Sequence, residues 1–148
     1  MIRKANKFDI PILAEFMRHY AAESPVKILN NAEHHDDNYI ANLLNSIIAG
    51  RGFILVDDEI NGMIAAIITP NIWCQKVLEL HELAWWIKPE HRNWILGGRL
   101  WKAFNDEADK MLKENRVQLV MVTKMATSPD LNYEKRGFKL LDMNYFKE

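Results

Sequence analysis

The sequence predicts a single α/β domain, because segments with helical periodicity and segments with strand periodicity alternate along residues 1–148. Two helix-like segments come first. Two strand-like segments then flank an Asn-Gly pair at positions 61 and 62, and a third apolar run opens through Gly97-Gly98 into a long amphipathic segment. A domain of this length buries roughly 70% of its unfolded surface, which is enough for one independent core.

The first helix is expected to run from about Asp9 to Ala22. Asp9 precedes Ile10-Pro11 as an N-cap, and Phe8 and Leu13 are placed to pack together across the helix start. Tyr20 continues the apolar face of this helix. The preceding Met1–Lys7 segment is charged and lacks the apolar core of a signal peptide.

A second helix is expected over residues 40–48, after a polar stretch at 30–37, and glycines at 50 and 52 end it. Residues 53–56 and 63–68 read as largely buried strands, and Asn61-Gly62 supplies the turn of a hairpin between them.

The second half alternates strand, helix and strand. A strand over 77–87 leads to an amphipathic helix that ends near Asn115, and a further strand covers 117–122. A short helix is expected from Ser128, with Pro129 at its first position, to the stop at Gly137. Residues 138–146 are expected to close the chain as a strand.

Composition excludes several classes of function. Nineteen basic and 20 acidic residues leave a net charge of -1, which gives no electrostatic case for binding nucleic acid. No apolar run reaches the length needed to cross a membrane. The single cysteine, Cys74, rules out an internal disulfide framework and fits a reducing compartment, so we expect a cytoplasmic protein.

The junction between the third strand and the long helix has the layout of an anion-binding site. A helix start presents backbone N–H groups without intrahelical partners and a positive partial charge, and glycine permits close approach of a ligand. Arg92 and Arg99 bracket the Gly97-Gly98 pair and can add charge-assisted bonds to phosphate oxygens. The sequence therefore predicts a site for a phosphate-bearing cofactor.

With these residues in place, the chain resembles the GCN5-related N-acetyltransferases, the GNAT superfamily, over nearly its whole length. Residues 86–92 are similar to the end of the family's fourth strand, followed by its pyrophosphate loop, in which Arg92 fills the first position and Gly97 the last. The pair Trp85-Trp86 is more similar to bacterial and phage-encoded members than to histone-modifying ones. The resemblance implies a mixed, mainly antiparallel central sheet with helices on both faces.

The resemblance also implies acetyl-CoA (coenzyme A) as cosubstrate, and main-chain N–H groups near Trp86 and Ile87 that polarise its thioester carbonyl. The cofactor-binding residues that it implies are Trp86, Ile87, Arg92, Asn93, Trp94, Ile95, Leu96, Gly97, Gly98 and Arg99. Ile95 stands where the family usually has the first glycine. That departure leaves open an alternative, a degenerate CoA-binding domain that acts through protein contacts.

A second motif, residues 133–138, is similar to the family's tyrosine four residues ahead of Gly-Phe. In relatives that tyrosine protonates the departing thiolate, so Tyr133 is the general-acid candidate. The alternative is that Tyr133 only packs a short helix on the sheet.

Direct transfer needs a neutral amine, so a base or a water relay must remove a proton. Strand alternation places Glu79 and His81 on one face and Glu82 on the other, unless a bulge intervenes. The family carries a bulge in this strand, and Glu82 lies near where several relatives keep a catalytic glutamate. Glu82 is therefore the first candidate and His81 the second. The alternative for both is an ordinary polar contact.

The remaining polar and aromatic residues have simpler interpretations. Residues 34–37, His-His-Asp-Asp, are expected to form a helix cap rather than a metal site, and Cys74 lacks a paired base at motif spacing. Trp101 is expected in the core, whereas Trp73, Trp85 and Trp94 are suited to line a pocket or a homodimer contact.

Taken with the resemblance, the sequence predicts an acetyl-CoA-dependent N-acetyltransferase that moves an acetyl group to a primary amine by direct transfer. The acceptor is a small-molecule or protein amine, and transfer of another acyl group stays open. Metal, nucleic acid and membrane are not among the expected partners.

Overall fold

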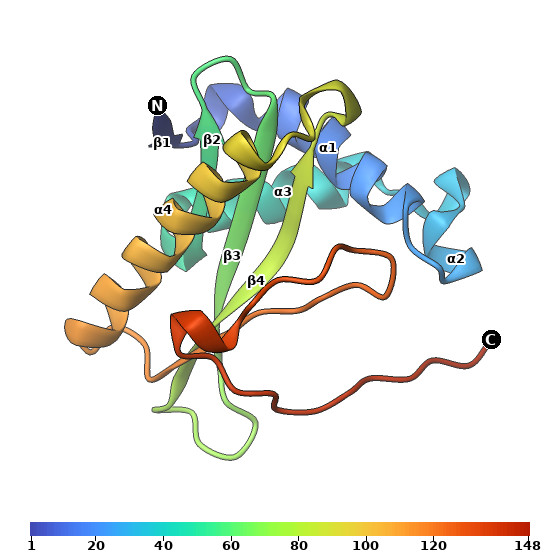
Figure 1. The fold of residues 1–148 in the computed structure, drawn as a ribbon. Helices are drawn as coiled ribbons and strands as arrows, with labels where there is room; N and C mark the ends of the chain where they lie inside the picture. Colours follow the sequence, from blue (N-terminus) through green and yellow to red (C-terminus); the bar gives the residue numbers. More distant parts are fainter.

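The protein, described over all residues 1–148 by a computed structural model, is built on one five-stranded sheet with the strand order β1-β2-β3-β4-β5 (Figure 1). Strands β1 to β4 are antiparallel to their neighbours, and β5 runs parallel to β4. The strand bounds are β1 Ile2–Lys4, β2 Gly52–Asp57, β3 Gly62–Pro70, β4 Leu78–Ile87 and β5 Leu119–Met121.

Helices cover both faces of this sheet, as expected. Helices α1 (Ile10–Ala22) and α3 (Asp37–Ser46) lie on one face, with the four-residue α2 (Lys27–Asn30) between them in sequence, and α4 (Trp94–Lys113) crosses the other face (Figure 1). Each face has its own apolar cluster. Phe16, Leu44 and Ile47 belong to the first, and Leu100 and Phe104 belong to the second. The predicted fold class is confirmed.

A β-bulge interrupts the pairing of β3 with β4. The register passes from Ala65–Ala84 to Ala66–Glu82, so Leu83 is the extra residue on β4. Directly opposed residues of an antiparallel pair share a face. Glu82 therefore lies on the face that α4 covers, and Ala84 lies on the face that α1 and α3 cover. The bulge implied by the resemblance is present.

The start of the chain differs from expectation. Strand β1 pairs with β2, which the charged Met1–Lys7 segment gave no pattern to predict. Asp9 precedes α1 as expected, yet its carboxylate accepts from the Asn6 backbone N–H (2.8 Å) and pairs with Arg3 (2.8 Å), which lowers the pKa of Asp9. Phe8 is 81% exposed, so the expected contact between Phe8 and Leu13 is wrong.

The following segments agree more closely with expectation. Asp36 caps α3 by accepting from the Tyr39 N–H at 3.0 Å, and a π-helical turn, Ile47–Arg51, ends the helix at Gly50. The hairpin of β2 and β3 forms as predicted. Its left-handed residue is Ile60 (φ 53°), and the Asp57 carboxylate accepts from backbone N–H groups across the turn.

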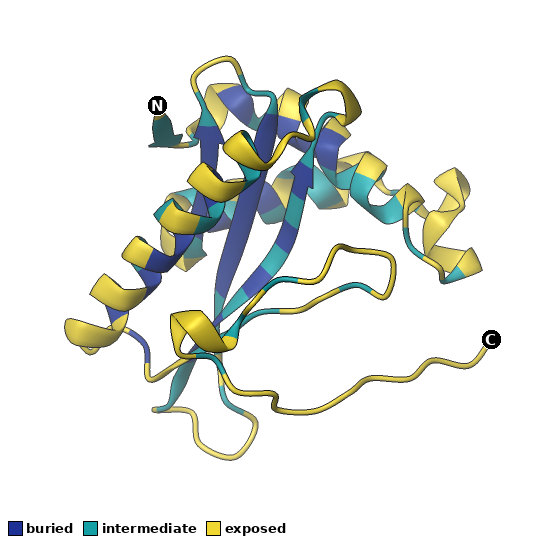
Figure 2. Cartoon of the chain, in the orientation of Figure 1, coloured by how far each residue is buried: buried dark blue, intermediate teal, exposed yellow.

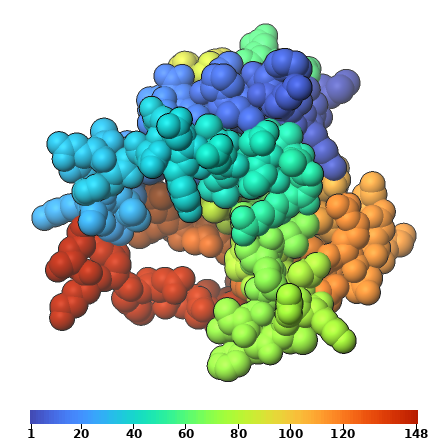
Figure 3. Space-filling view, turned by 180° about the vertical axis from the view of Figure 1, so that it is seen from behind, coloured from blue at the N-terminus to red at the C-terminus, as the bar shows by residue number.

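The end of the chain contains less regular structure than predicted. The helix expected over 128–137 is wrong, because only a 3-10 turn, Glu134–Arg136, forms there, although Gly137 does end it in the left-handed conformation (φ 87°). The strand expected over 138–146 is also wrong. Its apolar residues do not alternate strictly, so no single face of the segment can be buried, and the tail stays exposed (Figures 2 and 3).

No helix is both long and apolar enough to cross a membrane. The rings of the histidines at 34 and 35 donate to the backbone carbonyls of Ile28 (2.8 Å) and Leu29 (2.7 Å). No three His, Cys, Asp or Glu side chains come together in a metal-binding arrangement.

Candidate active site

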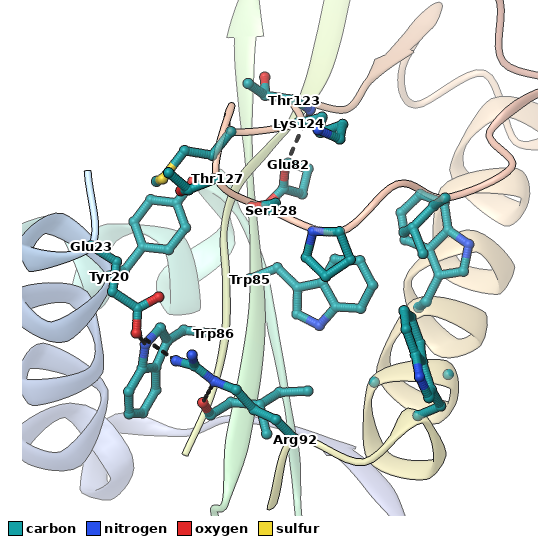
Figure 4. A pocket seen from close by; sticks show the side chains of 18 of the residues that line it. Tyr20, Glu23, Glu82, Trp85, Trp86, Arg92, Thr123, Lys124, Thr127 and Ser128 are labelled. Atoms are coloured by element: carbon teal, nitrogen blue, oxygen red, sulfur yellow. Dashed lines mark hydrogen bonds and ion pairs between the residues drawn. The ribbon is translucent and has the colours of Figure 1, made fainter. Parts of the chain in front are cut away.

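A cavity of about 430 Å³ opens where β4 and β5 separate. The two strands pair only from Glu79–Leu119 to His81–Met121, so β4 has no strand partner on that side beyond His81. The C-terminal end of α1, the start of α4 and residues 123–133 form the other walls (Figure 4).

Most of the predicted site residues line this one cavity. They are Glu82, Trp86, Ile87, Arg92, Asn93, Trp94, Gly97, Gly98 and Tyr133. Four do not. His81 lies outside it, and Ile95, Leu96 and Arg99 line a separate hollow of about 320 Å³ beside the β2–β3 turn, which Asn93 also reaches.

Glu82 is a buried carboxyl at the point where the strands part. Its Oε2 accepts a hydrogen bond from the Thr123 backbone N–H at 3.3 Å (Figure 4). Burial raises its pKa to about 7, and the Thr123 bond offsets part of that shift. A carboxyl that exchanges its proton near neutral pH is suited to general base catalysis.

His81 is engaged elsewhere. Its Nε2 bonds Glu79 Oε2 at 2.9 Å, and the same carboxylate accepts from Asn71 at 2.6 Å, which holds the pKa of Glu79 below its usual value. Alternation thus places Glu79 and His81 together, as predicted, and on the face opposite Glu82. This geometry favours Glu82 over His81.

Tyr133 both packs and faces the cavity. Its ring meets Trp101 edge-on, with centroids 5.8 Å apart, and meets Phe138 in the same way at 6.4 Å. Burial, then the charges of Glu82 and Asp130, raise the pKa of the phenol. Tyr133 therefore keeps its proton at neutral pH and can donate it within the cavity.

Tyr20 also lines the cavity, although the sequence predicted only that it belongs to the apolar face of the first helix. Figure 4 shows its ring entering the cavity from α1. Burial and the Glu82 carboxylate raise its pKa to about 12. The one available signal was its hydroxyl, which needs a polar neighbour when the ring is buried.

Trp101 is also more than a core residue. It lines the cavity and stacks on Trp85, with centroids 5.5 Å apart and planes 10° apart. Trp85 and Trp94 line the cavity, within the alternatives predicted, whereas Trp73 is exposed on the β3–β4 connection. The indole N–H of Trp85 is buried without an acceptor in the protein, which costs about 1–3 kcal/mol.

The start of α4 offers backbone donors and open space. Asn93 Oδ1 accepts from the backbone N–H groups of Ile95 (3.2 Å) and Leu96 (3.5 Å). These bonds are long, so a stronger acceptor such as a phosphate can replace Asn93. A Cβ at Gly98 would meet no atom within 4 Å, and one at Gly97 would make only ordinary contacts. The fold itself does not require glycine at either position, so the space suits a ligand.

Arg92 is held in place by three contacts at the cavity wall. Its Nε donates to the Ile87 carbonyl at 2.8 Å, and its Nη2 donates to Glu23 Oε1 at 2.5 Å. Its guanidinium lies 5.5 Å from the centre of the Trp86 ring, whose Nε1 also donates to Glu23 Oε1 (3.1 Å). Arg92 therefore lines the cavity with its guanidinium beside the end of α1.

Replacing Gly98 by alanine should weaken CoA binding at least tenfold while stabilising the fold. A methyl group there fills space that the ligand needs, whereas alanine in a helix is favoured over glycine by about 0.8–1 kcal/mol. Calorimetry gives the affinity and urea unfolding the stability. Asp109→Ala, on the exposed side of α4, is the matched control and should stabilise without changing affinity. Unchanged CoA affinity in Gly98→Ala would show that the ligand does not bind at this position.

Comparisons with known proteins give a structural likeness only. No family model matches the sequence, and no curated protein matches it. Among solved structures, one described as a possible acetyltransferase from Clostridium difficile 630 superposes with a TM-score of 0.69 at 16% identity, over 100% of this chain and 95% of that one. An acetyltransferase of Trypanosoma brucei gives 0.66 at 16% identity, over 100% and 98%.

A third structure, described as a predicted acetyltransferase from Clostridium acetobutylicum with acetyl-CoA, gives a TM-score of 0.63 at 18% identity, over 97% of this chain and 95% of that one. Whole-chain superposition at such low identity shows that the chain has the GNAT acetyltransferase fold. The fold implied by the resemblance is thereby confirmed.

Proposed function

We propose that this protein is an acetyl-CoA-dependent N-acetyltransferase that acts on a primary amine by direct transfer. One observation carries the proposal. A single cavity brings together a buried carboxyl, Glu82, a protonated phenol, Tyr133, and the open start of α4 with its two glycines. These are the base, the acid and the anion-binding element that the reaction needs.

The residues present fit the cosubstrate. Backbone donors at the start of α4 would hold its phosphates, and the separation of β4 from β5 leaves room for its pantetheine arm beside Trp85. Bound acetyl-CoA would supply a thioester whose acyl group the amine attacks. Ile95 is exposed and lies in the other hollow, so its side chain does not obstruct this cavity.

The protein's own groups then move the protons. Glu82 accepts a proton from the acceptor's ammonium group, directly or through water, and leaves a neutral amine that attacks the thioester; its pKa of about 7 gives it a substantial ionised fraction at neutral pH. Backbone N–H groups near Trp86 and Ile87 stabilise the negative charge that develops on the carbonyl oxygen. Tyr133 donates its proton to the departing sulfur and regains one from the nitrogen, directly or through water, because the nitrogen loses its second proton as the amide forms.

A thiol-release assay with acetyl-CoA tests the proposal against a panel of small amines and peptides. Free thiol should appear only when an amine is present. Mass spectrometry should find the amine about 42 Da heavier, because an acetyl group replaces one hydrogen. CoA binding without thiol release from any amine would instead favour the alternative, a CoA-binding domain that acts through protein contacts.

A further inference from the structure

We propose that Glu23 couples the binding of a phosphate-bearing ligand to the binding of the acceptor. Glu23 holds Arg92 in the free protein, and it binds a second positive charge of the acceptor once the phosphate of the ligand has bound Arg92. The inference rests on the proposed function and deepens it by naming the acceptor class, an amine with a second cationic group.

Charge pairing within the cavity points to this role. Four charged side chains line it, two acidic and two basic. Arg92 pairs with Glu23, and Lys124 pairs with Asp130 at 3.3 Å. Glu82 has no cationic partner. Once Arg92 is redirected, the cavity holds two carboxylates without ion-pair partners, an arrangement that recognises a dication.

The Glu23–Arg92 pair is suited to be exchanged. Both side chains are close to half exposed, and ion pairs of that kind contribute about 0–1 kcal/mol, because water competes for both charges. A pyrophosphate carries more negative charge than one carboxylate and can bind Arg92 by two parallel bonds. The expected exchange is therefore favourable.

Glu23 remains positioned after Arg92 leaves. Trp86 Nε1 still donates to its Oε1, and the Trp86 ring is fixed by stacking on His19 with centroids 5.0 Å apart. Glu23 also caps the C-terminal end of α1, where the helix dipole adds negative potential. A cation at this point is thus favoured by the carboxylate and by the helix together.

The test measures binding of 1,5-diaminopentane by calorimetry with and without saturating CoA, which carries no acyl group and so allows no turnover. The parent protein should bind the diamine about fivefold more tightly with CoA present, and by reciprocity bind CoA about fivefold more tightly with the diamine present. Pentylamine, which has one charge for Glu82, should show less than about a twofold change.

Glu23→Gln should abolish the coupling and bind CoA alone more tightly than the parent, because Arg92 starts free. Glu15→Gln, which removes an exposed carboxylate from the same helix outside the cavity, should retain the coupling. Equal diamine affinity with and without CoA, coupling retained in Glu23→Gln, or equal coupling for both amines would overturn the inference. Thiol release from acetyl-CoA with any amine would leave the proposed function standing in each of those cases.

Discussion

Replacing Tyr133 by phenylalanine is expected to lower the turnover number by about 10²- to 10⁴-fold, the range that general acid assistance contributes. The change removes one hydroxyl and keeps the ring that packs against Trp101 and Phe138. Because its raised pKa keeps the Tyr133 phenol protonated, the parent protein should not lose turnover through this group at mildly alkaline pH. Steady-state kinetics with a fixed amine, together with CoA affinity by calorimetry, measures both effects.

The affinity for CoA should stay within about twofold of the parent, since only an interaction with the reacting sulfur is lost. Tyr145→Phe removes a phenol from the exposed tail and serves as the matched control with unchanged turnover. If Tyr133→Phe turned over like the parent while chemistry limits the rate, Tyr133 would be a packing residue.

Glu82→Gln should lower the rate by about 10²- to 10⁴-fold at pH 7, because the amide cannot accept the proton of the ammonium. The parent rate should rise with pH through about 7, the pKa of Glu82, and then level off. The variant should lack this step and recover partly towards pH 10, where more amine is already neutral. Rate profiles from pH 6 to 10 with one amine give the comparison.

His81→Gln changes a neighbouring residue on the other face of β4 and should follow the parent profile. If the rate profile of Glu82→Gln matched the parent while His81→Gln lost activity, the histidine would be the general base. Parent-like profiles for both would assign deprotonation to solvent.

The same Glu82→Gln variant should be more stable than the parent at alkaline pH. The pKa of Glu82 is about 7 in the folded state and 4.5 when unperturbed, so the folded state binds the extra proton between these values and stability falls as pH rises through them. Above pH 7 the cost of the buried charge approaches about 3 kcal/mol, which glutamine avoids. Urea unfolding should show that gap at pH 8 and none at pH 4.

Much of the fold followed from periodicity. The helices before the hairpin, the hairpin itself and the long amphipathic helix were each predicted, because their apolar residues repeat with one clear period. Strand β1 was missed because it has only three residues, two of them charged, and so carries no period. Residues 128–146 were overpredicted, since capping residues at Ser128-Pro129 and apolar residues after Gly137 are local signals that packing did not reinforce.

The candidate site was predictable wherever one motif is contiguous in sequence. Most of the residues predicted between positions 86 and 99 therefore line the same cavity as Tyr133, although helical rotation turned Ile95, Leu96 and Arg99 away. Tyr20 and Glu23 were missed because they come from a helix more than fifty residues upstream. Nothing in a single sequence places that helix end against β4.

The bulge at Leu83 also bears on the rates of ligand entry. A bulge bends its strand and increases its twist, and here the pairing of β4 with β5 ends at His81, two residues before the bulge. The opening is thus set by backbone pairing and needs no side chain to swing aside. Association with a ligand should then proceed without a preceding opening step, at the rate that diffusion and orientation allow. Deletion of Leu83 would keep Glu82 and Ala84 on their present faces of the sheet but remove the bend in β4. This one extra residue therefore keeps the cavity open between β4 and β5.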